Sequence, residues 1–256
     1  MGLCQSKPLS LAFATKYTSI EQIRGRSQSY SNINFQCVIS IDFSASNGML
    51  HSNTSSPYLQ IIYEIEPVVL YLTQSDILSF RFGCADSTDK SIVPLINEQF
   101  RFHSFQELID GYKTAVDNVI QSGPTRFKAT VEKCIRIIVE QNEDQNNKEK
   151  QTESKQQFVT LCFIPTDGQL NTEDAEILVE ASKYAICFIV IGLGSEDFSG
   201  YKEFNPTGRK FNNFAFIDYE NIRNAAEHID VSQKLSLMIF DHIEAQIQDM
   251  TKAGII

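Results

Sequence analysis

The chain has 256 residues, of which 42% are hydrophobic, and its formal net charge at pH 7 is −10. This length and apolar content predict one α/β domain with a sizeable core. The acidic balance argues against the basic surface that is typical of nucleic-acid-binding proteins, so we expect no nucleic-acid partner. No apolar run approaches the roughly 20 residues of a membrane span, and we expect no secretory leader.

Cysteine and histidine spacing argues against two further kinds of site. The six cysteines include no Cys-x-x-Cys pair, and Cys37, Cys162 and Cys187 lie within apolar runs. Reduced cysteine behaves as a small hydrophobe in such runs, so we expect a cytosolic chain without disulfides. The four histidines have no metal-ligand spacing, which makes a zinc site improbable.

The first residues predict lipidation. Met1-Gly2-Leu3-Cys4-Gln5-Ser6 fits the myristoylation pattern, with glycine at position 2 and serine at position 6. A single myristoyl chain binds membranes only marginally, and palmitoylation of Cys4 would supply the second signal. The alternative is an ordinary flexible start that happens to begin with Met-Gly. Lipidation at Gly2 and Cys4 predicts that residues 1–15 are a tail that holds the protein at the cytoplasmic face of the plasma membrane or of an endomembrane.

From residue 16 onwards, predicted strands alternate with predicted helices. Apolar, β-rich runs predict strands over residues 34–41, 77–82, 158–164, 185–191 and 213–217. Apolar residues at helical spacing predict helices over residues 58–72, 105–121, 125–140, 172–182 and 220–250. Pro67 should kink or shorten the first helix, and the last should be in two pieces around His228–Ser232. This alternation predicts a doubly wound, mostly parallel sheet flanked by helices on both faces.

Two polar stretches have simple interpretations. Residues 141–156 contain no apolar side chain, which predicts a mobile surface insertion within a domain of residues 16–256. Within this domain, residues 220–256 are predicted to form a C-terminal helical extension. Asp174 and Glu176 follow a predicted helix start at Asn171 or Thr172, and we expect solvated side chains that favour the helix dipole.

Five oxygen-bearing side chains follow predicted strand ends or turns. Asp42, Ser44 and Ser46 come directly after the first strand, Thr125 follows a Gly-Pro turn, and Asp167 follows the third strand. Ligands of open α/β sheets bind outside the carboxyl ends of the strands, so all five can reach one rim. Hard oxygen donors of this kind suit Mg²⁺. Taken singly, the same residues read as turn hydroxyls, turn aspartates or a helix cap, and spacing alone does not show that they converge.

These residues also resemble a known family. Asp42-x-Ser44-x-Ser46, Thr125 and Asp167-Gly168 match the metal-ion-dependent adhesion site of von Willebrand factor A domains. Over about residues 16–235 the chain resembles, more narrowly, the copine A domain. The motifs that carry this resemblance are Ile41-Asp42-Phe43-Ser44-x-Ser46-Asn47, Phe82-Gly83, Gly123-Pro124-Thr125, Thr166-Asp167-Gly168 and Ile191-Gly192-x-Gly194-x-x-Asp197-Phe198.

The resemblance implies a doubly wound domain that holds Mg²⁺ or Mn²⁺. In the family pattern the two serines and sometimes the threonine contact the ion directly, and the aspartates contact it directly or through water. An Asp or Glu of a protein partner often completes the coordination shell. The resemblance therefore predicts a metal-dependent interaction module without enzymatic activity, with Asp42, Ser44, Ser46, Thr125 and Asp167 at the metal.

The chain also departs from the family that it resembles. Full copines carry two calcium-dependent phospholipid-binding domains ahead of this one, whereas about 33 residues precede the first strand here. We therefore expect a short form in which lipidation replaces calcium-triggered membrane docking. Related plant proteins add a RING zinc module for ubiquitin transfer, but residues 241–256 contain one histidine and no cysteine. We therefore expect no ubiquitin transfer.

Two other functions remain as alternatives. A magnesium-dependent phosphoryl hydrolase can use a similar scaffold, but such phosphatases often have Asp-x-Asp, and Ser44 cannot act as the second acid. The other alternative is a scaffold that binds partners through its helix faces without metal.

Overall fold

A seven-stranded sheet forms the centre of the computed structural model, which describes residues 14–88, 90–148, 157–225 and 230–256. The five longer strands are parallel to one another, and two short strands at one edge are antiparallel to β2. The order is β3-β2-β1-β5-β6-β7, with β4 also paired to β2. The strands are β1 (Ile33–Asp42), β2 (Ile77–Phe82), β3 (Val93–Pro94), β4 (Arg101–Phe102), β5 (Gln157–Thr166), β6 (Ile186–Gly192) and β7 (Phe214–Asp218).

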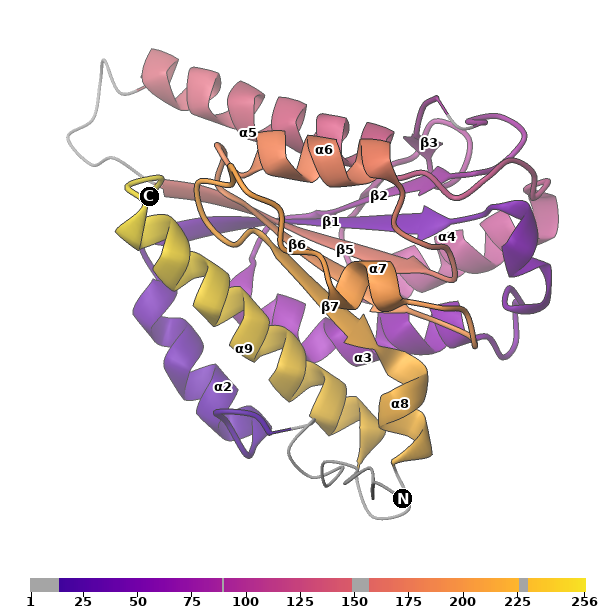
Figure 1. Cartoon of the computed structure of the whole chain (residues 1–256), viewed down its shortest axis with the longest axis horizontal. Coiled ribbons are helices and arrows are strands. Elements are labelled where there is room, and N and C mark those ends of the chain that lie inside the picture. The colour runs from indigo at the N-terminus through magenta and orange to yellow at the C-terminus, as the bar shows by residue number, and fades with distance from the viewer. Residues whose placement is uncertain (1–13, 89, 149–156, 226–229) are drawn as a thin grey trace, which may run out of the picture.

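Helices cover both faces of this sheet (Figure 1). One face carries α2 (Ile20–Ser27), α3 (Pro57–Leu72), α4 (Phe105–Asn118), α8 (Tyr219–Asn224) and α9 (Val231–Lys252). The other face carries α5 (Lys128–Lys148) and α6 (Thr172–Ala181), with the short α7 (Ser199–Lys202) beside them. Alternate residues of β1 enter different cores, since Ile39 packs towards α3 and Val38 towards α5. The predicted doubly wound, mostly parallel sheet is confirmed.

Polar side chains begin several of the helices. Ser56 accepts a hydrogen bond from the Leu59 backbone N–H at 2.9 Å, and Pro57 occupies the first helical position of α3. Pro67 does not shorten α3, which continues to Leu72, and the kink that is the other predicted effect stays a prediction. Ile62, Ile65 and Val69 of this helix are buried in the core. Their packing stabilises the helix against the loss of one backbone hydrogen bond.

Helices α4 and α5 differ from their predicted bounds. Helix α4 ends at Asn118, short of residue 121, because Ser122 is held by backbone bonds to the loops after β1 and β2. Helix α5 begins at Lys128, so Thr125 lies in the loop ahead of it. It also continues to Lys148, which makes the first half of the predicted insertion at 141–156 helical. Gln141, Glu143, Gln145 and Lys148 favour helix, and the stretch continues a helix already formed over residues 128–140, which offsets the weaker helix propensity of the Asn and Asp residues between them. Residues 149–156 lie outside the described residues.

The C-terminal helical segment is in two pieces, as predicted. Helix α8 directly follows β7, and α9 begins at Val231 after the Asp230 cap. Five cysteines fall within the described residues, and all five are buried and free. Within the same residues, no helix combines the length and apolar character needed to cross a membrane. Gly2 and Cys4 lie outside the described residues.

Helix α2 was not predicted, and one buried carboxylate attaches it to α9. Glu244 of α9 forms ion pairs with Lys16 and Arg26, and it accepts hydrogen bonds from Tyr17 at 2.9 Å and Tyr30 at 3.0 Å. Burial raises the pKa of Glu244, but these hydrogen bonds outweigh that effect and lower the pKa to about 2. The donors come from residues 16–30. Apolar periodicity, the signal used to predict helices, gives no sign that these residues contact α9.

Replacing Glu244 with glutamine is expected to lower the free energy of unfolding by about 1–3 kcal/mol, because buried donors lose a charged acceptor. The folded-state pKa lies below the unfolded value, so this stabilisation is present above about pH 4 and is lost as the pH falls towards 2. Urea unfolding at pH 7 and pH 3 measures both effects. Asp249→Asn, which removes an exposed pair with Lys252, should change stability by less than about 0.5 kcal/mol.

Candidate metal centre

The carboxyl end of β1 delivers one buried carboxylate to the rim of the sheet. Asp42 is the last residue of β1 and is fully buried. Its Oδ1 accepts the Ser44 backbone N–H at 2.9 Å, which fixes the turn that follows. A short 3₁₀ helix, Ala45–Met49, begins directly after Ser44. The order of strand, aspartate and turn therefore places Ser44 and Ser46 beside Asp42.

The five predicted side chains come together at this point. Ser44 Oγ lies 2.8 Å from Thr125 Oγ1 and 3.2 Å from Ser46 Oγ. Ser46 Oγ donates to Asp167 Oδ1 at 2.8 Å, and Thr125 Oγ1 donates to Asp42 Oδ2 at 3.2 Å. Residues up to 125 positions apart in the sequence thus form one continuous cluster of oxygen atoms.

Two neighbours of the cluster had no predicted role. Thr166 Oγ1 donates to Asp42 Oδ2 at 2.5 Å and accepts the Gly168 backbone N–H at 3.0 Å. Asn47 Nδ2 donates to Ser44 Oγ at 2.8 Å, and Tyr58 donates to the Asn47 side chain. Thr166 and Asn47 both lie within motifs that carry the family resemblance. Their place in these motifs was the signal in the sequence that could have revealed their role. Their hydrogen bonds orient the side chains that line the site.

A buried histidine supports the same strand end. His51 is stacked between Phe43 and Tyr58, with both ring-centroid distances at 4.2 Å. Its Nε2 lies 2.8 Å from the Asp42 carbonyl, which can only accept, so Nε2 carries the proton. Tyr112 therefore donates its hydroxyl proton to His51 Nδ1 at 2.9 Å. Burial lowers the pKa of His51 to about 4, which keeps the ring neutral and gives it a structural role.

Two glycines allow the loops to approach one another. Gly83 has a φ of +72°, and a Cβ there would lie 2.8 Å from the Ser44 backbone nitrogen. At Gly168 a Cβ would lie 2.2 Å from Thr125 Cγ2. Larger side chains at either position would displace Ser44 or Thr125, so both glycines are required by the packing of the site.

The electrostatics of the site favour a cation. Burial raises the pKa of Asp42, and hydrogen bonds from Thr166 and Ser44 act in the opposite direction. Burial also raises the pKa of Asp167 to about 6, and the negative charges of Asp42 and Glu196 add to the rise. Two carboxylates held this close repel each other. A bound divalent cation would offset both the burial and the repulsion.

Asp174 does not have the solvated position predicted for it. Its side chain is fully buried, whereas Glu176 is exposed as expected. Burial raises the pKa of Asp174 to about 7, although the backbone N–H groups of Lys128 and Phe127 act to lower it. Helix α6 packs against the start of α5, which turns this position inward. The sequence pattern of one helix cannot show which face a second helix covers.

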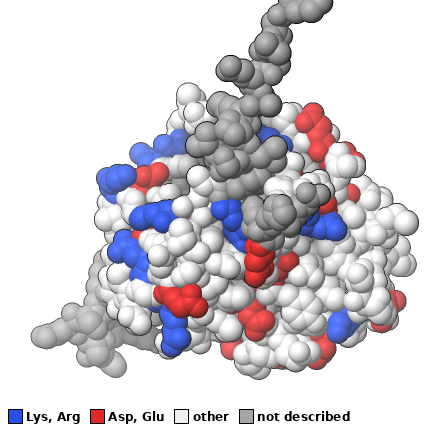
Figure 2. Space-filling model, turned by 90° about the horizontal axis from the view of Figure 1, so that it is seen from below, with Lys and Arg blue, Asp and Glu red and all other residues white. Residues whose placement is uncertain are grey.

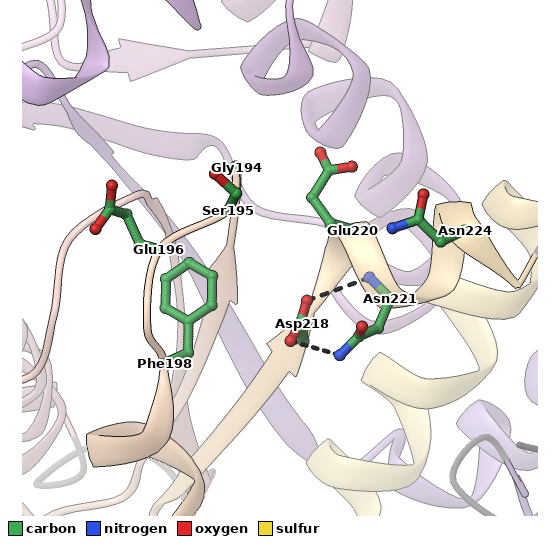
Figure 3. Close-up of a pocket in the computed structure, with 8 residues that line it drawn as sticks. All are labelled: Gly194, Ser195, Glu196, Phe198, Asp218, Glu220, Asn221 and Asn224. Atoms are coloured by element: carbon green, nitrogen blue, oxygen red, sulfur yellow. Dashed lines mark hydrogen bonds between the residues drawn. The ribbon is translucent and has the colours of Figure 1, made fainter.

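Acidic side chains outnumber basic ones in the rest of the rim. The loops at residues 43–53, 167–171 and 193–198 contain no lysine or arginine. The loops at residues 83–92 and 119–127 contain Lys90 and Arg126, and Arg126 pairs with Glu173 at 3.2 Å. A pocket lies where β6 and β7 end, lined partly by Glu196, Asp218 and Glu220 (Figure 3). The dashed lines show Asp218 hydrogen-bonded to Asn221, and Asp218 also pairs with Lys202. The acidic character of this rim therefore extends beyond the five-residue cluster.

The donor set fits a hard divalent cation. All five side chains offer oxygen, which Mg²⁺ and Mn²⁺ prefer, and both ions keep water at positions the protein leaves open. A bound ion would supply a Lewis-acidic position that accepts a further oxygen ligand. In the described residues, no group of three or more histidine, cysteine, aspartate or glutamate side chains could hold a metal. Hydroxyl groups would therefore have to provide part of the shell.

Comparison with known proteins identifies the family. The family model described as Copine matches residues 46–256, most of the chain. The chain belongs to the copine family. Ser46, Thr125 and Asp167 lie within the matched region, whereas Asp42 and Ser44 lie just before it. The copine resemblance predicted from the motifs is therefore confirmed.

Relatives of this copine-family chain are diverged and longer. The E3 ubiquitin-protein ligase RGLG4 of Arabidopsis thaliana is 24% identical over 232 residues, which covers 83% of this chain and 57% of the relative. Copine family protein 1 of Caenorhabditis elegans is 22% identical over 275 residues, which covers 100% of this chain and 23% of the relative. The chain therefore spans about half, or less, of the length of these curated relatives.

A solved structure supports the fold of this copine domain. The N-terminal domain of TFIIH p34 has a TM-score of 0.53 at 10% identity, covering 82% of this chain and 98% of that domain. A von Willebrand factor type A protein from Catenulispora acidiphila has a TM-score of 0.44 at 16% identity, covering 82% of this chain and 42% of that one. At 10% identity, the likeness to the TFIIH p34 domain concerns the fold alone.

Asp167→Asn is expected to stabilise the metal-free protein at pH 7 by about 1–2 kcal/mol. The folded-state pKa of Asp167 is about 6, above the unfolded value of about 4. As the pH rises from 4 to 6, the unfolded chain loses this proton first, so the fold loses stability. Asparagine has no carboxyl group to ionise, so the variant avoids this loss of stability. Its side-chain oxygen can still accept the hydrogen bond from Ser46. Urea unfolding in EDTA at pH 4.5 and pH 7 tests this, and a loss of stability at pH 7 would contradict it.

Proposed function

We propose that this copine-family domain is a metal-dependent protein-interaction module. Mg²⁺ or Mn²⁺ would be held by Asp42, Ser44, Ser46, Thr125 and Asp167, directly or through water. An Asp or Glu carboxylate of a protein partner would take the open coordination position. The observation that carries the proposal is the convergence of these five side chains, from three separate loops, into one hydrogen-bonded cluster.

The charge of the rim supports the metal dependence. An acidic partner would meet Asp42 and Asp167 within the cluster and Glu196 nearby. The basic residues of the rim loops are Lys90 and Arg126, and Arg126 is already paired with Glu173 at 3.2 Å. Without a cation the rim would repel such a partner, and with a cation it would bind one. Acidic partners are therefore expected to bind only when the metal is present.

The proposed module acts by binding and has no catalytic step of its own. Ser44 occupies the position at which a phosphoryl hydrolase of similar scaffold would carry its second aspartate. His51 is neutral, and both of its ring nitrogens are engaged in hydrogen bonds. Several relatives are named E3 ubiquitin-protein ligases, and those names describe proteins that extend well beyond the matched region.

The proposal also places the module at a membrane. Myristoylation of Gly2 and palmitoylation of Cys4 would tether it to the cytoplasmic face of the plasma membrane or of an endomembrane. Cell fractionation of Gly2→Ala and Cys4→Ser variants tests this step separately from metal binding. Retention of both variants in the membrane fraction would contradict it.

Calorimetric titration of the purified chain with MgCl₂ and MnCl₂, in parallel with Asp42→Asn, tests the metal site. Saturable binding that is lost in the variant would support the proposal. If no heat is detected, the titration is repeated with a short aspartate-containing peptide present, because the partner's carboxylate would complete the shell. Absence of binding in both titrations would refute the metal site and favour the metal-free scaffold.

A further inference from the structure

Two large apolar side chains are left in solvent at the rim of the sheet. Met49 is 96% exposed and Ile120 is 72% exposed. In the part of the chain that the structure describes, these are the two most exposed large hydrophobic residues. Single exposed apolar residues are common on proteins. Two that stand together beside a candidate binding site need an explanation.

Both residues belong to segments that form the metal centre. Met49 ends the short helix that begins after Ser44, and it lies three positions beyond Ser46. Ile120 lies five positions before Thr125, and its carbonyl accepts the Ala85 backbone N–H at 2.9 Å. The Ala45 N–H donates to the Ser122 carbonyl at 3.1 Å, so the two segments are hydrogen-bonded to each other.

The segments also touch next to the apolar residues themselves. A Cβ on Gly48 would lie 3.4 Å from Gln121 Oε1. Gly48 and Gln121 are the chain neighbours of Met49 and Ile120 respectively. The two apolar side chains therefore belong to one surface, which we call the Met49–Ile120 surface, and this surface adjoins the cluster that contains Ser46 and Thr125.

The charge around this surface favours a protein partner over a lipid bilayer. Residues 43–53 and 117–125 contain Asp117 and no lysine or arginine, and Arg126, the next residue of the loop, is paired with Glu173 at 3.2 Å. Binding to the anionic face of a membrane relies on basic side chains near the lipid. Figure 2, which views the molecule from below Figure 1, shows lysine and arginine more numerous towards the left than on the right-hand side, where both signs of charge occur.

We propose that the Met49–Ile120 surface is the specificity contact for the partner of the metal site. The partner segment would present an Asp or Glu to the metal and bulky apolar side chains next to it, which would cover Met49 and Ile120. The inference rests on the proposed function, because the metal positions the carboxylate. The carboxylate would provide metal dependence, and the apolar contact would select among the many acidic segments available.

A library of short peptides with a fixed central aspartate and random flanks tests this proposal. The peptides are displayed on phage, and the full chain is immobilised in buffer that contains MnCl₂. Bound phage are eluted with EDTA, so that only metal-dependent binders are recovered. We expect leucine, isoleucine, methionine or phenylalanine to be enriched next to the aspartate. Synthetic peptides from this pool should bind about tenfold more weakly to Met49→Ser and to Ile120→Ser, because each variant loses one buried apolar contact.

Controls separate this inference from the proposed function. Mn²⁺ titration of both variants should match the unchanged chain. Leu70→Ser, a change at a 59% exposed residue of α3, should leave peptide affinity unaltered.

Metal-dependent peptides without apolar flanks, or with equal affinity for the serine variants, would overturn the inference and leave the metal site intact. Failure to bind Mn²⁺ with or without peptide would overturn both. Vesicles of phosphatidylcholine and phosphatidylserine that bind the unchanged chain but not the serine variants would make the surface a membrane contact and also overturn the inference.

Discussion

Asp42→Ala is expected to weaken Mn²⁺ and Mg²⁺ binding by at least about 100-fold, beyond the 10–100-fold typical of changes to groups that only support a ligand. Asp42 is buried at the centre of the cluster and accepts hydrogen bonds from Ser44, Thr125 and Thr166. Removing it leaves one carboxylate, Asp167, to neutralise a divalent ion. Partner binding should disappear together with metal binding, because the open position no longer carries a positive charge.

The same change affects stability in two opposite ways. The Ser44 N–H and the Thr166 hydroxyl lose a buried acceptor, which costs about 1–3 kcal/mol. Loss of a buried carboxylate whose pKa is raised offsets part of this cost. Calorimetry with MnCl₂, together with circular dichroism, separates the loss of metal from unfolding. Asp42→Asn is the matched variant, since it keeps an oxygen acceptor for Ser44 and removes the charge. Unchanged Mn²⁺ affinity in both variants would show that the ion does not bind here.

Gly168→Ala is expected to weaken metal binding by about 10–100-fold without altering any side chain in the cluster, an effect of the size seen for supporting groups. A Cβ at this position would lie 2.2 Å from Thr125 Cγ2 and 2.4 Å from Thr125 Cβ. These atoms are too close for either residue to stay in place, so the loop that carries Thr125 must move. Thr125 Oγ1 would then lose its contacts with Ser44 and Asp42.

Mn²⁺ titration of Gly168→Ala measures this displacement, and thermal unfolding measures its cost, which we expect to be about 1–3 kcal/mol as for other overpacked sites. Gly25→Ala is the matched control. Gly25 lies within α2, and a Cβ there would meet nothing within 4 Å. That change should raise stability by about 0.5–1 kcal/mol and leave Mn²⁺ affinity unchanged. Equal Mn²⁺ affinity in Gly168→Ala would show that Thr125 is not needed at the metal.

The strands and the main helices were predictable because each contains its own signal. Strand β6 is a continuous run of apolar residues, as expected for a parallel strand covered on both faces. Helix α6 begins at a polar cap and has acidic residues in its first turn. Helix α2 also has a serine cap, Ser19, and Glu21 in its first turn, but its short sequence has only the isoleucines Ile20 and Ile23 as large apolar residues, too few for a periodic signal. It is attached instead by ion pairs to Glu244, more than 200 residues away.

The residues of the site also divide into those that the sequence predicted and those that it did not. Asp42, Ser44, Ser46, Thr125 and Asp167 were found from the sequence because they lie within motifs that follow strands or turns. The supporting contacts of His51 and Thr166, and the burial of Asp174, depend on which loops and helices face one another.

The sequence alone thus determined the doubly wound fold, the copine family and the candidate oxygen ligands, because strand periodicity and motif order are local properties of the chain. Only the tertiary structure decided that the five side chains meet in one cluster, that acidic residues outnumber basic ones in the rim around them, and that Met49 and Ile120 remain in solvent beside it. Those features arise from contacts between residues far apart in the chain, which no local pattern records.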